Sequence, residues 1–156
     1  MKDTAKISTP LGLVLITAAN DTITGLSFTD DPPETAVTPK TPLLKEAERQ
    51  LSEYFSGIRK AFDLPLRAEG TEFQKTVWAA LRSIPYGETR SYGQVAKSIG
   101  RPSASRAVGM ANNKNPILIL TPCHRVVGSD GGLVGYAGGL ERKEQLLKLE
   151  RTHANR

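Results

Sequence analysis

The stretch from Thr121 to Val127, TPCHRVV, places the strongest constraint on the fold of this chain. It contains the only cysteine, Cys123, followed directly by His124, and the apolar run Ile117–Leu120 leads into it. Consecutive apolar side chains are stable only when buried, so Cys123 must follow a segment fixed in the interior. A lone thiol beside an imidazole is a candidate reactive centre, although a free cysteine is also a common packing residue.

The cysteine content also limits the class of protein. One cysteine cannot form an internal disulfide, and an unpaired thiol fits a reducing compartment, so we expect a cytoplasmic protein. With two histidines, His124 and His153, the chain lacks the ligands of a nitrogen-and-sulfur zinc site, and we expect no metal. No run of about 18 apolar residues and no signal-peptide core is present, so we expect no membrane association.

Charge is distributed unevenly along the chain. Residues 1–66 carry seven Lys/Arg and nine Asp/Glu, whereas residues 67–156 carry fourteen Lys/Arg and seven Asp/Glu. The net charge of +5 therefore belongs to the C-terminal part. Such a basic half favours a polyanionic partner, most simply nucleic acid, although a basic surface without a partner would give the same count.

The N-terminal part predicts a small antiparallel sheet with one helix. Residues 6–9, 13–17 and 23–28 have strand composition and are separated by turn residues, and 62–66 could add a strand. Four prolines between Asp30 and Pro42 predict a loop. Apolar residues then recur at helical spacing from Leu43 to Phe55, with Gly57 as a stop. Nothing here resembles a site, so we assign residues 1–68 to a supporting domain.

The basic part, assigned to a second domain of residues 69–156, predicts a series of short helices. Two of them open with the capping-box pairs Thr71/Gln74 and Ser91/Gln94. After a break at 100–102, Ser103 is the expected cap of a third helix, 104–112. The second and third form a helix-turn-helix pattern in a region with five basic residues and one acidic residue. The predicted fold class is α+β, with the cysteine in the mostly helical second domain.

The third predicted helix suggests how such a domain could handle DNA. Its side chains are mostly small, so few of them could read base edges, and Arg106 is the exception. A long cation among small residues could enter the base stack, which suits recognition by shape and phosphate rather than by sequence. A surface salt bridge is the alternative role for Arg106.

A glycine-rich loop and a last helix follow the cysteine. Residues 128–139 include six glycines, so this loop can bring backbone N–H groups close to a ligand. In the helix expected over 140–150, Glu150 shares the inward face of Leu146 and Leu147 and would need a partner, which His124 or Arg125 could supply. The alternative is a carboxylate at a frayed C-terminal end of the helix, exposed to water. Cys123, His124 and Glu150 could then form a relay in which a water joins thiol and imidazole.

The segment Pro122–Val126 resembles the active-site motif of the O6-alkylguanine-DNA alkyltransferases, also called methylated-DNA–protein-cysteine methyltransferases. Further segments agree with that family in order and spacing: 91–92, 105–109, 115–116, 136–140 and Glu150. The resemblance covers about half of the chain, roughly residues 73–150, and the N-terminal part is similar only in layout.

This resemblance implies direct-reversal DNA repair without a cofactor. A monomer would bind double-stranded DNA through the minor groove and flip an O6-alkylated guanine into a pocket. Cys123 would take the alkyl group irreversibly, once per molecule, and O4-alkylated thymine is a further candidate substrate. His124 and Glu150 would remove the thiol proton through a water, and Asn115 would hold the active-site turn.

The resemblance also implies a pocket and a DNA contact surface. The pocket would consist of Tyr92, Val126, Tyr136, Ala137 and Gly138. Tyr92 would donate a proton toward guanine N3, and Arg106 would fill the space left by the flipped base. The DNA backbone would be contacted by Gln74, Gly93, Arg101 and Ser129. Some family members have Ser at the position of Ala137. This chain therefore lacks a side-chain hydroxyl that could contact O6 of the guanine, and a backbone N–H would have to make that contact.

Two other functions fit parts of the pattern. A cysteine hydrolase or peptidase with the same three residues would turn over without DNA, which leaves the basic helix pair unexplained. A DNA-binding regulator or lesion sensor without chemistry would not need Cys123. Incubation with DNA containing O6-methylguanine, followed by peptide mass measurement, separates the three functions.

Overall fold

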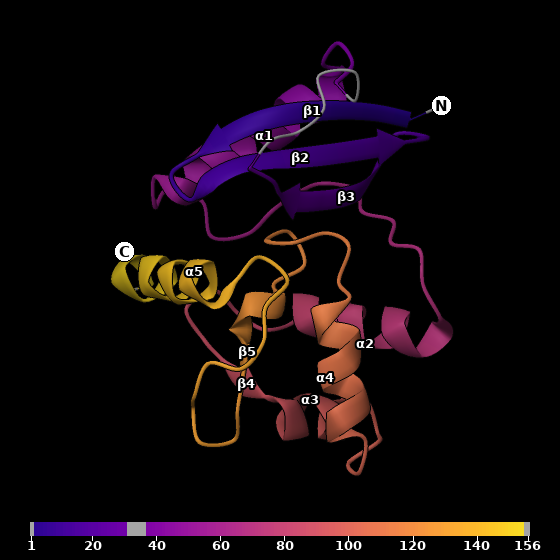
Figure 1. The fold of residues 1–156 in the computed structure, drawn as a ribbon, viewed down its shortest axis with the longest axis vertical. Helices are drawn as coiled ribbons and strands as arrows, with labels where there is room; N and C mark the ends of the chain where they lie inside the picture. Colours follow the sequence, from indigo (N-terminus) through magenta and orange to yellow (C-terminus); the bar gives the residue numbers. More distant parts are fainter. Residues whose placement is uncertain (1, 31–36, 155–156) are drawn as a thin grey trace. The chain divides into compact units, whose positions relative to one another are not determined.

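The computed structural model describes residues 2–30 and 37–154, and the chain divides into two compact units, 1–68 and 69–156 (Figure 1). Each unit has its own buried apolar side chains. The first is a sheet with one helix and the second is mainly helical, so the predicted α+β class is confirmed.

The first unit is built on an antiparallel sheet in the order β1-β2-β3. Its strands are β1 (Lys2–Thr9), β2 (Gly12–Ala19) and β3 (Thr22–Phe28). The turn between β2 and β3 uses Asn20 and Asp21, which have φ angles of 51° and 62°. Two consecutive residues with positive φ give the turn the twist that a tight hairpin requires. The predicted antiparallel sheet is therefore confirmed.

Helix α1 (Pro42–Phe55) packs on one face of this sheet (Figure 1). Its buried apolar residues recur at helical spacing: Leu44, Ala47, Leu51 and Tyr54. The Thr41 hydroxyl caps the first turn by accepting a hydrogen bond from the Leu44 N–H at 3.3 Å. Gly57 has a φ of 79°, which a glycine adopts without steric cost, and the helix has ended by this point, as predicted.

Residues 62–66 do not form the expected strand. Among them Leu66 alone pairs with the sheet, as an isolated parallel bridge to Ile23 of β3. Pro65 has no N–H, and its carbonyl accepts a hydrogen bond from Ile23 at 2.8 Å, so the ladder cannot continue along this segment. The predicted loop over 30–42 falls partly on residues 31–36, which lie outside the described residues, and 37–41 have no regular structure.

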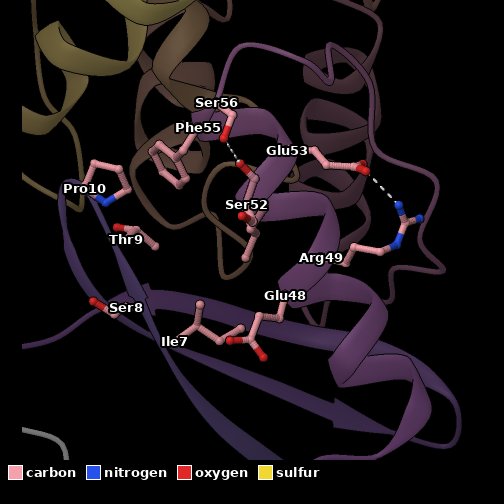
Figure 2. Close-up of a pocket in the computed structure, with 11 residues that line it drawn as sticks. Ile7, Ser8, Thr9, Pro10, Glu48, Arg49, Ser52, Glu53, Phe55 and Ser56 are labelled. Atoms are coloured by element: carbon pink, nitrogen blue, oxygen red, sulfur yellow. Dashed lines mark hydrogen bonds and ion pairs between the residues drawn. The ribbon is translucent and has the colours of Figure 1, made fainter.

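A groove of about 420 Å³ lies between the end of β1 and α1 (Figure 2). Its apolar lining includes Ile7, Leu51 and Phe55. The Arg49 guanidinium lies 2.8 Å from a carboxylate oxygen of Glu53, and it also pairs with Glu46. The third charged residue of the groove, Glu48, pairs with Lys40, so each of its charged side chains has an ion-pair partner.

The second unit contains α2 (Glu72–Arg82), α3 (Tyr92–Ser98), α4 (Ser105–Asn113) and α5 (Leu140–His153). Both predicted capping boxes form. The Thr71 hydroxyl accepts from the Gln74 N–H at 3.1 Å, and the Gln74 side chain accepts from the Thr71 N–H at 2.9 Å. Ser91 and Gln94 repeat the arrangement at 3.1 and 2.8 Å. Local side-chain chemistry therefore fixes where α2 and α3 begin.

Helix α4 begins differently from the prediction. Its cap is Ala104, without a side-chain hydrogen bond, and the predicted Ser103 cap is wrong. The Ala104 N–H donates to the Arg101 carbonyl at 2.9 Å, so residues 101–104 form a turn that delays the helix. The buried Trp78 ties α2 to α4, because its indole N–H donates to the Ala111 carbonyl at 2.8 Å.

The apolar run 117–120 is buried, as predicted, but it forms tight turns rather than a regular element. Ile119 has a φ of 70°, an unusual and strained value for a β-branched residue. The chain then reaches β5 (Val126–Val127), which pairs in parallel with β4 (Arg90–Ser91). This short pair joins the start of α3 to the cysteine segment.

Candidate active site

Cys123 begins a single turn of 3-10 helix, Cys123–Arg125, which we call the Cys123 turn. The cysteine is 1% exposed. The side-chain amide of Asn115 donates to the carbonyls of Thr121 at 2.8 Å and of Ile117 at 3.3 Å, and its oxygen accepts from the Ile117 N–H at 3.0 Å. Asn112 of α4 donates to the Cys123 carbonyl at 3.4 Å. Two buried asparagines thus hold the backbone on both sides of the thiol.

Glu150 of α5 faces the Cys123 turn, and its side chain is fully buried. Its Oε2 lies 2.7 Å from Nε2 of His124. Arg125 donates to both carboxylate oxygens, at 2.8 and 3.0 Å, and the Gly87 N–H donates to Oε1 at 3.2 Å. The prediction of an inward Glu150 is confirmed, and both candidate partners are used at once.

These contacts define the protonation states of the pair. Burial alone would raise the pKa of Glu150, but the hydrogen bond from His124 and the hydrogen bonds and charge of Arg125 hold this pKa far below its usual range. Burial lowers the pKa of His124, although Glu150 opposes this, so the imidazole is neutral at pH 7. An ionised Glu150 requires Nε2 to carry the proton, which leaves Nδ1 as an acceptor. Nδ1 is buried and has no partner in the described part of the chain.

The thiol itself is not ionised at neutral pH in this structure. Burial raises the pKa of Cys123 to about 11, while a hydrogen bond from Asn115 and the positive charge of Lys143 act in the opposite direction. Any reaction in which the Cys123 sulfur acts as a nucleophile would therefore require removal of the thiol proton. The unprotonated Nδ1 of His124, in the same turn, could accept that proton.

The loop 132–139 and α3 bring further predicted residues to this site. The Tyr92 hydroxyl donates to the Val134 carbonyl at 2.7 Å. Tyr136 is buried, and its hydroxyl has no partner among the described residues. Burial and the nearby Cys123 raise the pKa of both tyrosines, which indicates that both lie close to the thiol. Val126, which directly follows the Cys123 turn, is also buried, whereas Ala137 is exposed and Gly138 is half-buried.

Most of the residues predicted to contact DNA are exposed. Arg106 lies on the exposed side of α4, with Met110, 61% exposed, one turn later. Arg101 lies 5.7 Å from the centre of the Phe73 ring. Gly93 and Ser129 are exposed, and the Gln74 side chain is committed to its capping box. A groove of about 260 Å³ separates the start of α2 from α4 and is lined by Thr71, Phe73, Gln74, Ala107, Met110, Ala111 and Lys114.

Known proteins share both units of this chain. The family model for the DNA binding domain of 6-O-methylguanine DNA methyltransferase matches residues 72–152, and the model for its ribonuclease-like domain matches 4–68. A methylated-DNA–protein-cysteine methyltransferase of Mycolicibacterium paratuberculosis is 48% identical over 151 residues, which are 95% of this chain and 92% of that protein. The chain belongs to the methylated-DNA–protein-cysteine methyltransferase family.

Other members of this methyltransferase family are similarly close. The Methanosarcina acetivorans protein is 66% identical over 106 residues, 68% of each chain. A crystal structure of Mycobacterium tuberculosis O6-methylguanine methyltransferase has a TM-score of 0.88 and 46% identity, covering 98% of this chain and 94% of that one. A structure of Mycobacterium tuberculosis OGT in complex with DNA has a TM-score of 0.87 and 45% identity, covering 97% and 93%.

Sequence reasoning missed two residues of this methyltransferase site. Lys143 is fully buried, and its ammonium group donates to the carbonyls of Val134 and Gly135 at 3.0 and 3.1 Å. Asn112 is buried under the Cys123 carbonyl. The sequence spacing did indicate that Lys143 faces inward, because it lies two helical turns before Glu150 and therefore on the same face of α5.

Among residues 2–30 and 37–154, no group of three or more His, Cys, Asp or Glu side chains could hold a metal ion. Within the same residues, no helix has the length and apolar character needed to cross a membrane.

Proposed function

We propose that this chain repairs DNA alkylated at O6 of guanine by moving the alkyl group to Sγ of Cys123. The observation that carries the proposal is the buried thiol in the same turn as a neutral His124, which is backed by an ionised Glu150. The family to which the chain belongs is named for transfer to a protein cysteine, and this chain has one cysteine.

The reaction needs only groups that the site contains. Nδ1 of His124, through a bridging water, accepts the thiol proton, and Glu150 balances the charge that forms on the imidazole. The thiolate attacks the alkyl carbon, the carbon–O6 bond breaks, and its electron pair remains on the guanine. Tyr92 exchanges its hydrogen bond with Val134 for one to guanine N3 and donates its proton to the base as the carbon–O6 bond breaks. Solvent then takes up the proton held by His124 and restores the Tyr92 hydroxyl, so one proton in all moves from the thiol to the guanine. A thioether does not hydrolyse, so each molecule acts once.

Reaching O6 requires the base to leave the duplex. We propose that α4 enters the minor groove, that the lesion flips into the pocket and that Arg106 occupies the vacated space. Support comes from the exposure of Arg106 and the basic charge of residues 67–156. The pocket would be formed by Tyr92, Val126, Tyr136, Ala137 and Gly138. Backbone contacts would come from Gln74, Gly93, Arg101 and Ser129.

We propose that the two units have different roles. Residues 69–156 would carry DNA binding and alkyl transfer, and residues 1–68 would support them. We propose a monomer that needs no cofactor. The cytoplasm is the proposed compartment, because a reducing environment preserves the free thiol.

The decisive experiment follows the alkyl group. Duplex DNA containing O6-methylguanine is incubated with the protein. The protein is then digested, and the mass of the Cys123 peptide is measured by mass spectrometry. We expect one added methyl group per molecule and unmodified guanine in the DNA, and Cys123→Ser should give neither while it still binds DNA. A duplex with O4-methylthymine tests the second substrate. Repeated turnover, or an unmodified Cys123 peptide with the lesion still present, would refute the proposal.

A further inference from the structure

The exposed face of α4 carries one large apolar side chain between two cations. Met110 is 61% exposed, and Arg106 and Lys114 lie four residues before and after it, about one helical turn away on each side. The exposed residues of α4 and its C-terminal cap recur at helical spacing: Arg106, Ala107, Met110, Asn113 and Lys114. The function proposed above uses Arg106 and leaves Met110 without a role.

Met110 also lines the groove between the start of α2 and α4. The half-buried ring of Phe73 lines this groove too, and the Arg101 guanidinium lies 5.7 Å from the centre of that ring. The indole N–H of Trp78 donates to the Ala111 carbonyl at 2.8 Å and holds α2 against α4, so the groove has fixed walls. A single exposed apolar residue is ordinary on a protein surface, but this one shares a groove with an aromatic ring and is bordered by cations.

An apolar surface bordered by cations matches the sugar–phosphate backbone of DNA. The deoxyribose rings that wall the minor groove present mainly C–H groups, and the phosphates beside them carry the negative charge. Lys114 is the charged residue among those that line the groove on the protein. A neutral apolar partner would leave Arg106 and Lys114 without an opposite charge, whereas a DNA strand supplies both kinds of surface. Methionine suits this contact, because its side chain is flexible and minor-groove proteins use it among their apolar contacts.

We propose that Met110 packs against deoxyribose rings in the wall of the minor groove, while Lys114 pairs with a phosphate beside them. The inference rests on the proposed entry of α4 into the minor groove, and it adds an apolar contact that does not depend on charge. Four residues of a helix advance by about 6 Å, so Met110 would touch the duplex beside the space that Arg106 fills rather than inside it. Such a contact positions the duplex on α4 without reading its sequence.

Equilibrium binding to an undamaged DNA duplex at several salt concentrations separates an apolar contact from a phosphate contact. The slope of log K against log salt reports the number of phosphates that are neutralised, and an apolar contact does not change it. Met110→Ala removes the apolar side chain, Met110→Gln keeps its length but makes it polar, and Met110→Leu keeps it apolar. Ile58→Ala is the matched control, because Ile58 is an apolar residue of the first unit that is 74% exposed. Thermal unfolding checks that each variant is folded.

We expect Met110→Ala and Met110→Gln to bind about tenfold more weakly at every salt concentration, with the wild-type slope. Met110→Leu and Ile58→Ala should bind like wild type, and Lys114→Gln should reduce the slope by about one. Wild-type affinity in Met110→Ala, or a weaker affinity with a reduced slope, would overturn the apolar contact, and an unchanged slope in Lys114→Gln would overturn the phosphate contact. Undamaged DNA requires no alkyl transfer, so a wild-type protein that binds DNA but leaves Cys123 unmodified would refute the proposed repair and not the role of Met110.

Discussion

Replacing Glu150 by glutamine should destabilise the second unit and slow alkyl transfer together. The substitution keeps the shape of the side chain and one oxygen acceptor, but it removes the charge that Arg125 and His124 share. Arg125 is 7% exposed, and its other contacts are the Ile84 carbonyl at 2.7 Å and the ring of Tyr86. Neither contact carries a negative charge, so the guanidinium would remain buried without a counter-ion.

The magnitude follows from the cost of an uncompensated buried charge. Removing one partner of a buried ion pair costs about 3–5 kcal/mol, and the retained amide oxygen favours the lower end, about 3 kcal/mol. For a unit of this size each kcal/mol lowers Tm by about 4–8 °C, so we expect a loss of roughly 12–24 °C. The amide also no longer stabilises an imidazolium at His124, and we expect transfer to slow at least about a hundredfold.

The pH dependence of the stability is an independent test of the Glu150 carboxylate. The pKa of Glu150 is lowered in the folded protein, so its contribution is fully present above the unfolded-state pKa of about 4.3 and is lost as the pH falls from there toward the folded-state pKa. Wild type should therefore lose stability in this acid range. Glu150→Gln should lose less over the same range, because the titrating group is gone.

Thermal and urea unfolding at neutral and acid pH, with single-turnover transfer from O6-benzylguanine, measure these effects. Glu144→Gln is the matched control, since Glu144 lies on the exposed side of the same helix. If Glu150→Gln unfolds and reacts like Glu144→Gln at neutral pH, the carboxylate neither compensates Arg125 nor supports His124. The relay would then be wrong.

Two further substitutions test the proposed DNA surface and the support of the active-site turn. Arg106→Ala should slow repair of O6-methylguanine in duplex DNA much more than reaction with free O6-benzylguanine, because the side chain is exposed and its proposed role is to fill the space that the flipped base leaves in the duplex; equal losses in both assays would contradict the base-flipping role. Asn115→Ala removes the hydrogen bonds to Thr121 and Ile117 and should lower the free energy of unfolding by about 1–3 kcal/mol, with slower transfer; unchanged urea unfolding would show that the turn does not depend on this residue.

The features predicted correctly from the sequence depend on local spacing. Both capping boxes need only residues three positions apart, and the inward direction of Glu150 follows from helical periodicity. Ser103 failed as a cap because a turn closed by the Arg101 carbonyl moves the start of α4, and a hydrogen bond of that kind leaves no mark in side-chain composition.

The unpredicted features depend on long-range contacts. Burial of Lys143 is tolerated because backbone carbonyls of the glycine-rich loop meet its amine, and residue type alone would place a lysine at the surface. The strained φ of Ile119 was also not predicted, and it lies in buried turns that the Asn115 side chain holds with hydrogen bonds. For Lys143 the backbone of another segment decides the position, and the sequence pattern of a single helix does not contain that information.

One helix connects the proposed DNA surface to the reactive turn. Arg106 lies on the exposed side of α4, whereas Asn112 lies on its buried side and donates to the Cys123 carbonyl. The β4–β5 pair makes a second link, because Ser91, which caps α3, is paired with Val127 just after the Cys123 turn. A displacement of α3 or α4 on binding DNA would therefore act directly on the backbone that holds the thiol. Helix α4 therefore links the proposed DNA surface to the backbone of the nucleophile, and a substitution at Asn112 should slow single-turnover transfer without removing a group that is proposed to touch DNA.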